Sequence, residues 1–322
     1  MIAIADRTLD PYWNLAAEEY IFDKFEGPVV RLWRNDDSII LGRNQNAYAE
    51  VNLPYVREHR VKVVRRLSGG GAVFHDPGNV NYSFFNFDED SPVSFTDPVI
   101  KALRGLGLDV CASGRNDLLL DGYKISGTAV YRSGRKLLQH GTLLYDASID
   151  SLSEALVSRP EKFVGKSVKS VRSRVTNISK HLKTALPVED FFVYMAGCLM
   201  EGTESYRFTD ADRAAIGRLR DEKYATDEWN YGKSPAFTSS KVVKFPAGLL
   251  ELYIEVRNGT MTGVQISGDY FFSRPTEKFC EKMLGCGLSE KEIADRIGSL
   301  QVGEYFHGIS SEELLSLFVE AI

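Results

Sequence analysis

The sequence predicts an α/β fold: a large domain of mixed β-sheets flanked by helices, followed by a small C-terminal α/β domain. Two observations carry this prediction. The chain has 322 residues, which exceeds the size at which one hydrophobic core keeps growing. Strand-like and helix-like runs alternate along it, and a Gly-, Ser- and Pro-containing break at Trp229–Lys244 precedes a tail of different charge. We therefore expect domains at 1–238 and 246–322, joined by a linker.

Composition and charge exclude several classes of protein. Hydrophobic residues make up 43% and charged residues 26%, as in an ordinary soluble domain. No run approaches the roughly 18 apolar residues of a membrane helix, and Met1–Pro11 resembles no targeting peptide, so we expect a cytoplasmic protein. The net charge of −5 arises in Pro246–Ile322, where twelve acidic residues face six basic ones. This acidic balance argues against nucleic acid as a partner, and we expect a monomer.

The N-terminal third begins with a helix and continues with strands. Asp10-Pro11 is a cap followed by a first-turn proline, which predicts a helix that continues to Phe25. Alternating or continuous apolar runs then predict the strands Val29–Trp33, Ser38–Leu41 and Val61–Arg66. We expect the first two of these strands to pair across the turn at residues 35–37.

The middle of the chain adds more strands and then becomes helical. Strands are predicted at Ala72–Phe74, Asn79–Phe85, Leu118–Leu120, Lys124–Val130 and Lys136–Tyr145. Helices are predicted at Pro98–Leu106, Ser151–Val157, Val188–Leu199 and Asp210–Glu222.

The tail predicts a unit of its own. Asn258-Gly259 is a strong turn signal between the strands Leu249–Val256 and Met261–Ser267. Two helices begin with the capping-box patterns Ser289-x-x-Glu292 and Ser310-x-x-Glu313.

The most informative stretch is Arg65–Asp76, where two arginines lead into Ser68 and three glycines. Glycines bring no side chains to a core, but their bare N–H groups allow a ligand to approach the backbone closely. With two cations at its mouth, the loop suits a phosphate or a carboxylate. The alternative is a glycine hairpin whose arginines lie in water, and this segment alone does not decide between the two.

Three further segments combine Gly, Asn and cationic residues in short loops: Gly114–Asp117, Lys124–Ala129 and Lys169–Asn177. Lys124 stands beside small residues, so its ammonium could reach a ligand bound against the strand. The alternative is an exposed strand lysine after the Asp121-Gly122 turn. The last segment is either a ligand loop or a solvated basic loop.

Other chemistry is poorly supported. The chain has neither a P-loop nor a Gly-x-Gly-x-x-Gly motif, which excludes ordinary kinase and Rossmann sites. Ser68 with His75 prescribes no nucleophilic geometry. His75 and His140 could be ligands or acid–base groups, but the pattern favours a hydrogen-bonded structural role for each. The four cysteines show no zinc-like spacing, so we expect reduced thiols and no metal at Cys280 and Cys286.

Taken in order, these segments resemble the lipoate–protein ligase A family. The resemblance covers nearly the whole chain and rests on eight blocks in sequence: Asn14–Glu19, Leu41–Asn46, Arg65–Asp76, Gly114–Leu118, Lys124–Gly127, His140–Leu144, Val171–Asn177 and Trp229–Phe237. It implies the biotin/lipoate ligase-like fold and a two-step reaction. In the first step lipoate attacks the α-phosphate of ATP to give lipoyl-AMP and pyrophosphate, and in the second an acceptor lysine takes the lipoyl group and releases AMP.

The resemblance also implies roles for individual residues. Lys124 matches the lysine that contacts both the lipoyl carbonyl and the phosphate, and Asp117 matches a position near Mg²⁺. The full set expected to bind ATP or lipoyl-AMP is Arg66, Ser68, Gly69, Gly70, Gly71, Ala72, Val73, Phe74, His75, Asn116, Asp117, Lys124, Ser126, Gly127, His140, Gly141, Arg172 and Thr176. The expected acceptors are lipoyl domains of 2-oxoacid dehydrogenase E2 subunits, the glycine-cleavage H protein, or both.

Three alternatives stay open at this point. An octanoyl or lipoyl amidotransferase of the same fold would need a nucleophilic thiol near the lipoyl loop, and Lys166–Ser170 contains none. A biotin ligase shares the adenylate chemistry but fits the wording of Arg65–His75 less well. A non-catalytic lipoyl-AMP-binding regulator is disfavoured, though weakly, because Lys124, Asn116 and His140 are present.

Overall fold

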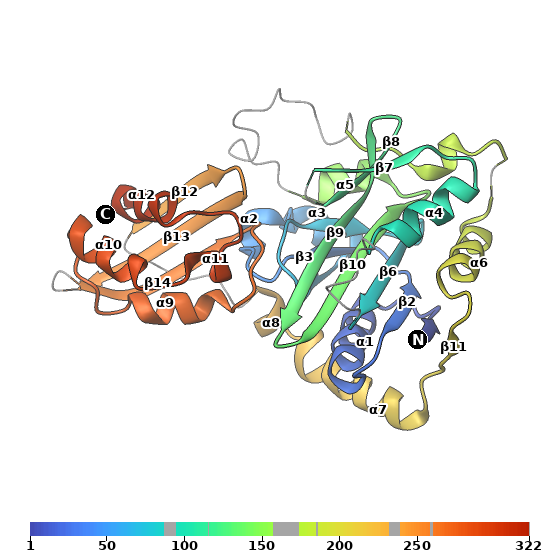
Figure 1. The fold of residues 1–322 in the computed structure, drawn as a ribbon, viewed down its shortest axis with the longest axis horizontal. Helices are drawn as coiled ribbons and strands as arrows, with labels where there is room; N and C mark the ends of the chain where they lie inside the picture. Colours follow the sequence, from blue (N-terminus) through green and yellow to red (C-terminus); the bar gives the residue numbers. More distant parts are fainter. Residues whose placement is uncertain are drawn as a thin grey trace.

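The computed structural model describes residues 1–86, 95–114, 116–156, 174–184, 186–231, 239–257 and 260–321. Figure 1 shows a large N-terminal unit, coloured blue to yellow, beside a smaller C-terminal unit in orange and red. The large unit holds two sheets and the small unit holds a third. The expected α/β fold with a separate C-terminal unit is therefore confirmed.

Eight strands form the main sheet of the large unit. Its order is β11 (Glu204–Ser205), β1 (Ile2–Ala5), β2 (Val29–Trp33), β6 (Asn79–Phe85), β10 (Lys136–Leu144), β9 (Tyr123–Ser133), β8 (Asp117–Leu120) and β7 (Val110–Ser113). Strands β7 to β10 pair antiparallel in sequence order, while β1 lies parallel to β2. The strand group predicted between residues 118 and 145 is thus a continuous meander.

The second sheet corrects one prediction. It has the order β4 (Lys62–Arg65), β3 (Ser38–Leu41) and β5 (Val73–His75). Strand β3 does not pair with β2, which lies between β1 and β6 in the main sheet. All residues of both strands are buried, so their packing partners include residues distant in the sequence. The short turn between β2 and β3 connects the two sheets.

Helices cover the sheets of the large unit. Their bounds are α1 Pro11–Lys24, α2 Ala47–Glu50, α3 Leu53–His59, α4 Asp97–Gly105, α5 Ile149–Ala155, α6 Val188–Leu199, α7 Asp210–Leu219 and α8 Asp227–Tyr231. Residues Ile178–His181 form the 3₁₀ turn η3, and Arg220–Tyr224 continue α7 as the π-helical η4. The cap of α1 is confirmed, because the Asp10 carboxylate accepts from the Tyr12 N–H at 3.3 Å.

Two helix predictions need small corrections. Helix α5 begins at Ile149 rather than Ser151, because the Ser148 hydroxyl accepts from the Ser151 N–H and starts the helix two residues earlier. The helix predicted to Glu222 changes to π geometry after Leu219. The pattern also missed β1, β7, β11, α2 and α3, which are short.

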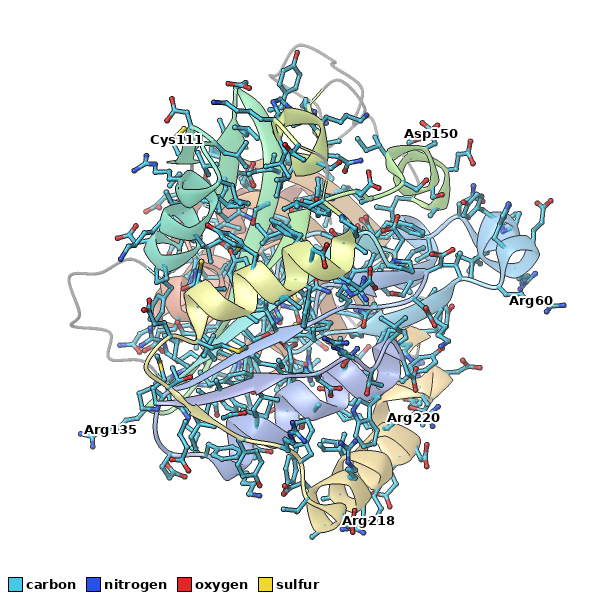
Figure 2. All side chains as sticks on the ribbon, turned by 90° about the vertical axis from the view of Figure 1, so that its right-hand side faces the viewer. Arg60, Cys111, Arg135, Asp150, Arg218 and Arg220 are labelled. Atoms are coloured by element: carbon cyan, nitrogen blue, oxygen red, sulfur yellow. The ribbon has the colours of Figure 1, made fainter. Side chains whose placement is uncertain are left out.

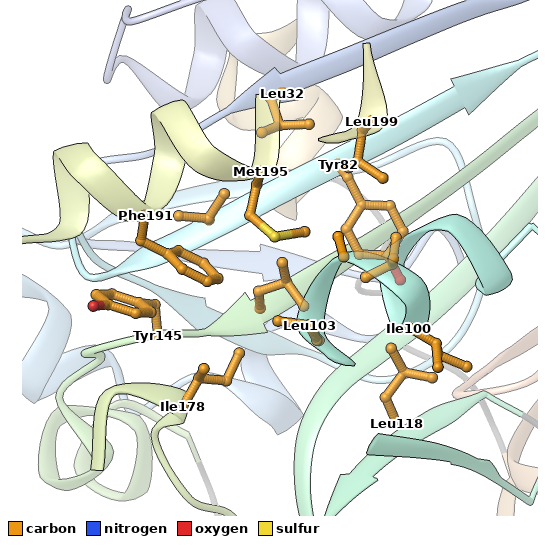
Figure 3. Close-up of a cluster of buried hydrophobic side chains, with 14 of the residues drawn as sticks. Leu32, Tyr82, Ile100, Leu103, Leu118, Tyr145, Ile178, Phe191, Met195 and Leu199 are labelled. Carbon is orange, nitrogen blue, oxygen red and sulfur yellow. The ribbon is translucent and has the colours of Figure 1, made fainter. Parts of the chain in front are cut away.

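A hydrophobic core fills the space between the main sheet and helices α4 and α6. Figure 3 shows its side chains, with Met195 and Phe191 from α6 facing Leu103 from α4. The rings of Tyr145 and Phe191 stack with centroids 4.0 Å apart. This core covers one face of the main sheet, whereas on the other face Val29, Phe85 and Leu138 belong to a second core that includes helix α1.

The C-terminal unit contains β12 (Ser239–Phe245), β13 (Gly248–Arg257), β14 (Thr260–Gly268), α9 (Thr276–Met283), α10 (Glu290–Gly298), α11 (Val302–Tyr305) and α12 (Ser311–Ala321). Strands β13 and β14 pair as predicted, while Asn258 and Gly259 lie outside the described residues. The linker prediction is wrong at its end, because Ser239–Phe245 pair with β13 as the first strand of this sheet. Apolar residues at alternate positions of a short edge strand gave too weak a signal against the neighbouring Gly and Ser.

Of the two predicted capping boxes, one forms fully. The Ser310 hydroxyl accepts from the Glu313 N–H, and the Glu313 carboxylate accepts from the Ser310 N–H at 2.9 Å. At α10 the Ser289 hydroxyl accepts from the Glu292 N–H, but it donates to the Glu292 carboxylate itself. Only the first half of that box is therefore present.

The two units touch through the loop before α2 and the glycine loop. The Gly268 N–H donates to the Asn44 carbonyl at 2.8 Å, and the Gly70 N–H donates to the Tyr270 carbonyl at 3.1 Å. Arg43 lies 3.6 Å from Glu277 across the same junction. The glycine loop is thus in direct contact with the C-terminal unit.

Charged side chains lie on the outside of the large unit. In Figure 2 the labelled side chains of Arg60, Arg135, Asp150 and Arg218 lie on the outside of the molecule, and all four are exposed. Among the described residues, no helix combines the length and the apolar character needed to cross a membrane.

Candidate functional site

Strand β6 separates the core from the site through its alternating side chains. Val80, Tyr82 and Phe84 belong to the hydrophobic core. Asn79 and Asn81, on the opposite face, line two cavities. Because successive side chains of a strand point to opposite faces, one strand supplies both the core and a polar cavity wall.

The first cavity is narrow, with a volume of about 160 Å³. Its inner end is formed by Leu15, Glu18 and Trp33, with Ile40 beside them. The residues around the rest of it come from the glycine loop, from β5, β6, β9 and β10 and from the turn before β8: Arg66, Gly70, Gly71, Ala72, Val73, His75, Asn81, Asn116, Lys124, Gly127, Thr128, Ala129, His140, Gly141 and Thr142. Phe271 of the C-terminal unit also lines it.

The second cavity is wide, with a volume of about 640 Å³. Asp117, Asp121 and Arg174 bring charge to its wall. The two cavities adjoin, since the residues Ala72, Val73, Lys124, Gly127 and Thr142 line both. Lys124 is therefore at the junction of a narrow and a wide space.

A chain of buried hydrogen bonds forms the inner wall of the narrow cavity. Arg66 Nε donates to Ser68 Oγ at 2.9 Å, and Ser68 Oγ lies 2.6 Å from His140 Nε2. His140 Nδ1 lies 3.1 Å from both carboxylate oxygens of Glu18. The Ser83 hydroxyl donates to Glu18 as well, and Trp33 Nε1 donates to Ser83.

The hydrogen bonds of this wall indicate which atoms of Glu18, His140 and Ser68 carry protons. Burial would raise the pKa of the Glu18 carboxyl, but His140, Ser83 and Arg31 outweigh burial and lower it. Glu18 is therefore ionised, and His140 donates to it from Nδ1 while Nε2 accepts from Ser68. The wall is complete without any ligand.

His75 and Asn81 behave differently from that chain. Asn35 Nδ2 donates to His75 Nδ1 at 3.1 Å, whereas His75 Nε2 and both amide atoms of Asn81 have no hydrogen-bond partner among the described residues. Burial, assisted by Arg66 and His140, lowers the pKa of His75 to about 3. Neutral, buried polar atoms without partners beside a cavity are available to a ligand or to water.

The two arginines of the glycine motif correct the sequence analysis. Arg65 donates to the carbonyls of Gly42, Gln45 and Trp229, among others. Arg66 donates to the carbonyls of Ile40, Gly69 and Gly71. Burial lowers the pKa of each guanidinium to about 10. The N–H groups of both arginines therefore stabilise the conformation of the loops and do not stand free at the mouth of the glycine loop to bind an anion.

The glycines are needed for close approach of backbone to backbone. A Cβ on Gly42 would lie 1.9 Å from the Gly70 carbonyl oxygen, and one on Gly69 would lie 2.3 Å from the Tyr270 oxygen. Gly70 has a φ of +86°. At Gly71 the nearest atom to such a Cβ is 4.0 Å away, so no neighbour in the protein requires a glycine there.

Lys124 is held by both its backbone and its side chain. Its N–H donates to the Arg174 carbonyl at 2.8 Å, and its own carbonyl accepts from the Thr176 N–H at 3.1 Å. Its Nζ lies 2.7 Å from Asp117 and above Gly127, where a Cβ would be only 3.1 Å away. Both side chains of the ion pair are about one-third exposed, at 36% and 34%. The glycine thus leaves room for the ammonium over strand β9.

Most predicted site residues lie at the two cavities. Phe74 and Asp117 line the wide one, and the predicted residues already named line the narrow one. Ser68, Gly69 and Ser126 are buried behind the wall, and the Thr176 hydroxyl lies 3.1 Å from His181 rather than in a cavity. Arg172 and the expected loop residues 169–173 lie outside the described residues.

Sequence reasoning missed Glu18, Trp33, Asn81, Thr142 and Phe271 as site residues. Glu18 stood within the Asn14–Glu19 block, where two adjacent glutamates on a largely apolar helix were the available signal. Phe271 could not be found locally, because it comes from the other unit.

Among the residues that the structure describes, neither a thiol nor a cluster of metal ligands lines the two cavities. All four cysteines lie within the described residues: Cys111 and Cys198 are exposed, and Cys280 and Cys286 are buried in the C-terminal unit. Among the described residues, no group of three or more His, Cys, Asp or Glu could hold a metal ion.

Comparisons with protein families match both units. Residues 10–199 match the lipoyl protein ligase A/B catalytic domain, and residues 234–318 match the bacterial lipoate protein ligase C-terminus. The chain is 37% identical to lipoate-protein ligase LplJ of Bacillus subtilis over 96% of both chains. It is 35% identical to lipoate–protein ligase 1 of Staphylococcus aureus, again over 96% of both.

Solved structures give the same fold. LipL1 of P. falciparum in complex with lipoate superposes with a TM-score of 0.79 over 99% of both chains, at 22% identity. A bi-partite lipoate protein ligase of Thermoplasma acidophilum, studied with its E2 lipoyl domain, gives 0.62 at 30% identity over 73% of this chain and 98% of that one. Lipoate-protein ligase A bound with ATP gives 0.60 at 28% identity over 71% and 98%.

Proposed function

The chain belongs to the lipoate–protein ligase family, and on that premise we propose how its two cavities share the reaction. It is a lipoate–protein ligase that uses ATP. The observation that carries the proposal is the position of Lys124, which lines both the narrow and the wide cavity.

The narrow cavity binds the lipoyl chain. Leu15, Trp33 and Ile40 offer apolar surface at its inner end, which suits the hydrocarbon chain and dithiolane ring. The carboxylate then lies at the other end, beside Lys124. The backbone of Gly70 and Gly71 allows the thin chain to lie directly against the loop.

The wide cavity binds ATP. Its volume of about 640 Å³ and its charged rim suit a nucleotide, and its shared wall brings the α-phosphate next to the lipoate carboxylate. The carboxylate oxygen attacks the α-phosphorus, pyrophosphate leaves, and lipoyl-AMP remains across the junction. Lys124 offsets the repulsion between the two anions and then the charge on the acyl oxygen.

Asp117 is the residue that would hold Mg²⁺. One carboxylate completed by phosphate oxygens is a common arrangement for this ion, whereas a full protein cage is rare. When bound, the ion would neutralise charge on the phosphates. Asp117 would then exchange its present partner, Lys124, for the ion.

In the second step a lysine of an acceptor protein attacks the acyl carbon and AMP leaves. The expected acceptors are lipoyl domains of 2-oxoacid dehydrogenase E2 subunits and the glycine-cleavage H protein, and the E2 lipoyl domain studied with the archaeal ligase supports the first. We further propose that the protein acts as a monomer in the cytoplasm, and that its C-terminal unit moves when the adenylate forms.

Lipoate-dependent exchange of pyrophosphate into ATP tests this assignment. The proposal expects exchange with the purified chain, followed by an acyl mass increment on an apo-lipoyl domain. An amidotransferase would show no exchange, and a non-catalytic regulator would show neither signal. The absence of exchange with both lipoate and octanoate would overturn the proposed first step.

A further inference from the structure

We propose that His75 and Asn81 select lipoate over acids of the same shape that lack sulfur, because their polar atoms hydrogen-bond the sulfur atoms of the dithiolane ring. This selectivity rests on the proposed function, since it takes the acyl group to lie in the narrow cavity. Both side chains line that cavity, and they are only 3% and 1% exposed. Both belong to the large unit, so the proposed movement of the C-terminal unit does not displace them from one another.

A relay of buried side chains fixes the orientation of His75. The guanidinium of Arg31, which can only donate, bonds to the side-chain oxygen of Asn14 at 2.6 Å. The amide nitrogen of Asn14 donates to the side-chain oxygen of Asn35 at 2.9 Å, so the Asn35 nitrogen is left to face His75 Nδ1, at 3.1 Å. Because Nδ1 accepts from Asn35, the proton of the neutral imidazole is on Nε2.

His75 therefore presents a buried N–H donor to the narrow cavity. Burial, assisted by Arg66 and His140, lowers the pKa of His75 to about 3, so the ring is neutral near pH 7. In the part of the chain that the structure describes, neither His75 Nε2 nor the amide of Asn81 has a hydrogen-bond partner. The Asn81 amide supplies further donors. A buried donor without an acceptor is costly, which favours a ligand atom that can accept.

Both groups lie near the inner end of the cavity. The rings of Trp33 and His75 have centroids 6.1 Å apart. Asn81 is the register partner of Trp33 across strands β2 and β6. Trp33 itself is part of the apolar surface proposed to hold the dithiolane ring, so the polar atoms of His75 and Asn81 flank the place of that ring.

The distance from the reacting end agrees with this placement. Asn81 pairs with Thr142 of β10, and the Thr142 hydroxyl accepts from the Gly127 N–H of β9 at 3.5 Å. Neighbouring strands lie about 4.8 Å apart, so Asn81 is roughly 10 Å from Gly127, the glycine beneath Lys124 Nζ. The methylene chain and ring of extended lipoate span a similar distance from the carboxylate.

Only the ring sulfurs have lone pairs at that end of lipoate. Sulfur is a weak hydrogen-bond acceptor, whereas a methylene group accepts nothing. An acid without sulfur would cover the donors of His75 and Asn81 and leave them unpaired. A site built to bond a substrate atom discriminates strongly against an analogue that lacks the atom, which an apolar surface alone does not achieve.

Pyrophosphate exchange with three acids tests this selectivity. Lipoate is compared with octanoate and with cyclopentylpentanoate, whose ring has methylenes in place of the two sulfurs. Asn81→Leu removes the amide at nearly constant side-chain volume. Asn79→Leu is the matched control: Asn79 lies on the same face of β6, is buried, has an oxygen without a partner among the described residues, and lines the wide cavity but not the narrow one.

In the wild type we expect kcat/KM for lipoate to exceed that for the cyclopentyl acid about tenfold, roughly the cost of one unpaired buried donor. Asn81→Leu should reduce this preference about threefold or more, chiefly because both sulfur-free acids are used better when no unpaired amide faces them. Damage to the fold would improve no substrate. Asn79→Leu should keep the wild-type preference, whatever its effect on ATP.

His75→Phe should reduce the preference in the same direction. The preference is a ratio measured on one preparation, so a loss of folded protein does not change it.

Equal use of lipoate and the cyclopentyl acid by the wild type would overturn the inference, because sulfur would then make no difference. An unchanged preference in both Asn81→Leu and His75→Phe would overturn it too, as would an equal loss of preference in Asn79→Leu. Failure of the proposed function is distinguishable, since the wild type would then show no exchange with lipoate at all.

Discussion

The narrow and wide cavities are built in opposite ways. The inner wall of the narrow cavity is a closed chain of hydrogen bonds from Arg66 through Ser68 and His140 to Glu18, all of them buried. At the wide cavity, Lys124 and Asp117 are each about one-third exposed to water. The acyl site is therefore formed in advance, whereas the nucleotide site gains strength when its ligand displaces water from these charges.

The cations show the same contrast. Arg65 and Arg66 donate mainly to backbone carbonyls, and Arg66 also donates to the Ser68 hydroxyl, so both arginines stabilise the shape of the loops. Lys124 pairs with Asp117, a partner that a ligand anion can replace. The buried cations Arg65 and Arg66 therefore hold the site in shape, whereas the partly exposed Lys124 is suited to binding the reacting anions.

The largest effect is expected at the half-exposed cation. Lys124→Ala should lower lipoate-dependent pyrophosphate exchange by about 10²–10³-fold, the usual cost of losing one donor to a developing oxyanion. Lys241 offers a matched control, because it is 37% exposed and pairs with Glu320 at 2.9 Å, much as Lys124 pairs with Asp117. Lys241→Ala should keep full exchange, and near-normal exchange by Lys124→Ala would remove Lys124 from the mechanism.

A substitution that breaks a close backbone contact beside the narrow cavity should destabilise the protein. Gly42→Ala places a Cβ against the Gly70 carbonyl and should reduce the free energy of unfolding by about 2–3 kcal/mol, the cost of overpacking. Gly71→Ala is the control for stability, because its Cβ meets no close neighbour. Urea unfolding measures both variants.

The Gly71 variant also sharpens the ligand assignment. If the lipoyl chain lies on the loop backbone, Gly71→Ala should keep wild-type stability but raise the KM for lipoate. Unchanged KM together with unchanged stability would place the chain elsewhere in the narrow cavity.

The buried wall should also respond to pH. Folding lowers the pKa of His75 from 6.5 to about 3, so below pH 6.5 the unfolded chain takes up a proton that the folded chain does not. His75 therefore contributes stability that is present above pH 6.5 and is lost as pH falls towards 3, by up to about 1.4 kcal/mol per unit.

Urea unfolding between pH 7 and pH 4 measures this slope. His75→Gln should flatten it, whereas His59→Gln should not, since His59 is exposed in the folded protein. Equal slopes for wild type and His75→Gln would show that His75 is not buried in its neutral form.

The smallest effect is expected at Asn81, whose buried amide has no hydrogen-bond partner in the part of the chain that the structure describes. Asn81→Leu should raise the free energy of unfolding by about 1 kcal/mol, because an unsatisfied buried amide is costly. Asn14→Leu is the contrasting variant and should destabilise, since the Asn14 amide donates to Thr8, Arg34 and Asn35. A loss of stability in Asn81→Leu would indicate that ordered water already satisfies Asn81.

Local patterns predicted the individual elements well and their partners less well. The cap at Asp10, the strand group between residues 118 and 145 and the helix Val188–Leu199 follow from neighbouring residues and are confirmed. The pairing of β2 with β3 is wrong, because each strand is buried among residues distant in sequence. The linker prediction at residues 239–244 is wrong, because the hydrogen bonds that make β12 a strand come from its distant partner β13.

The sequence by itself determined the α/β class, the glycine loop, the lysine on β9 and, through its ordered blocks, the resemblance to lipoate–protein ligases. Those features depend on residues close together in the chain. Only the tertiary structure decided that Arg66 shapes the loop, that Glu18 and His140 close the inner wall, and that Phe271 reaches the acyl cavity from the other unit. The physical reason is that contacts between distant segments determine burial and hydrogen-bond partners. These neighbours determine whether a charged side chain stabilises the fold or can bind a ligand.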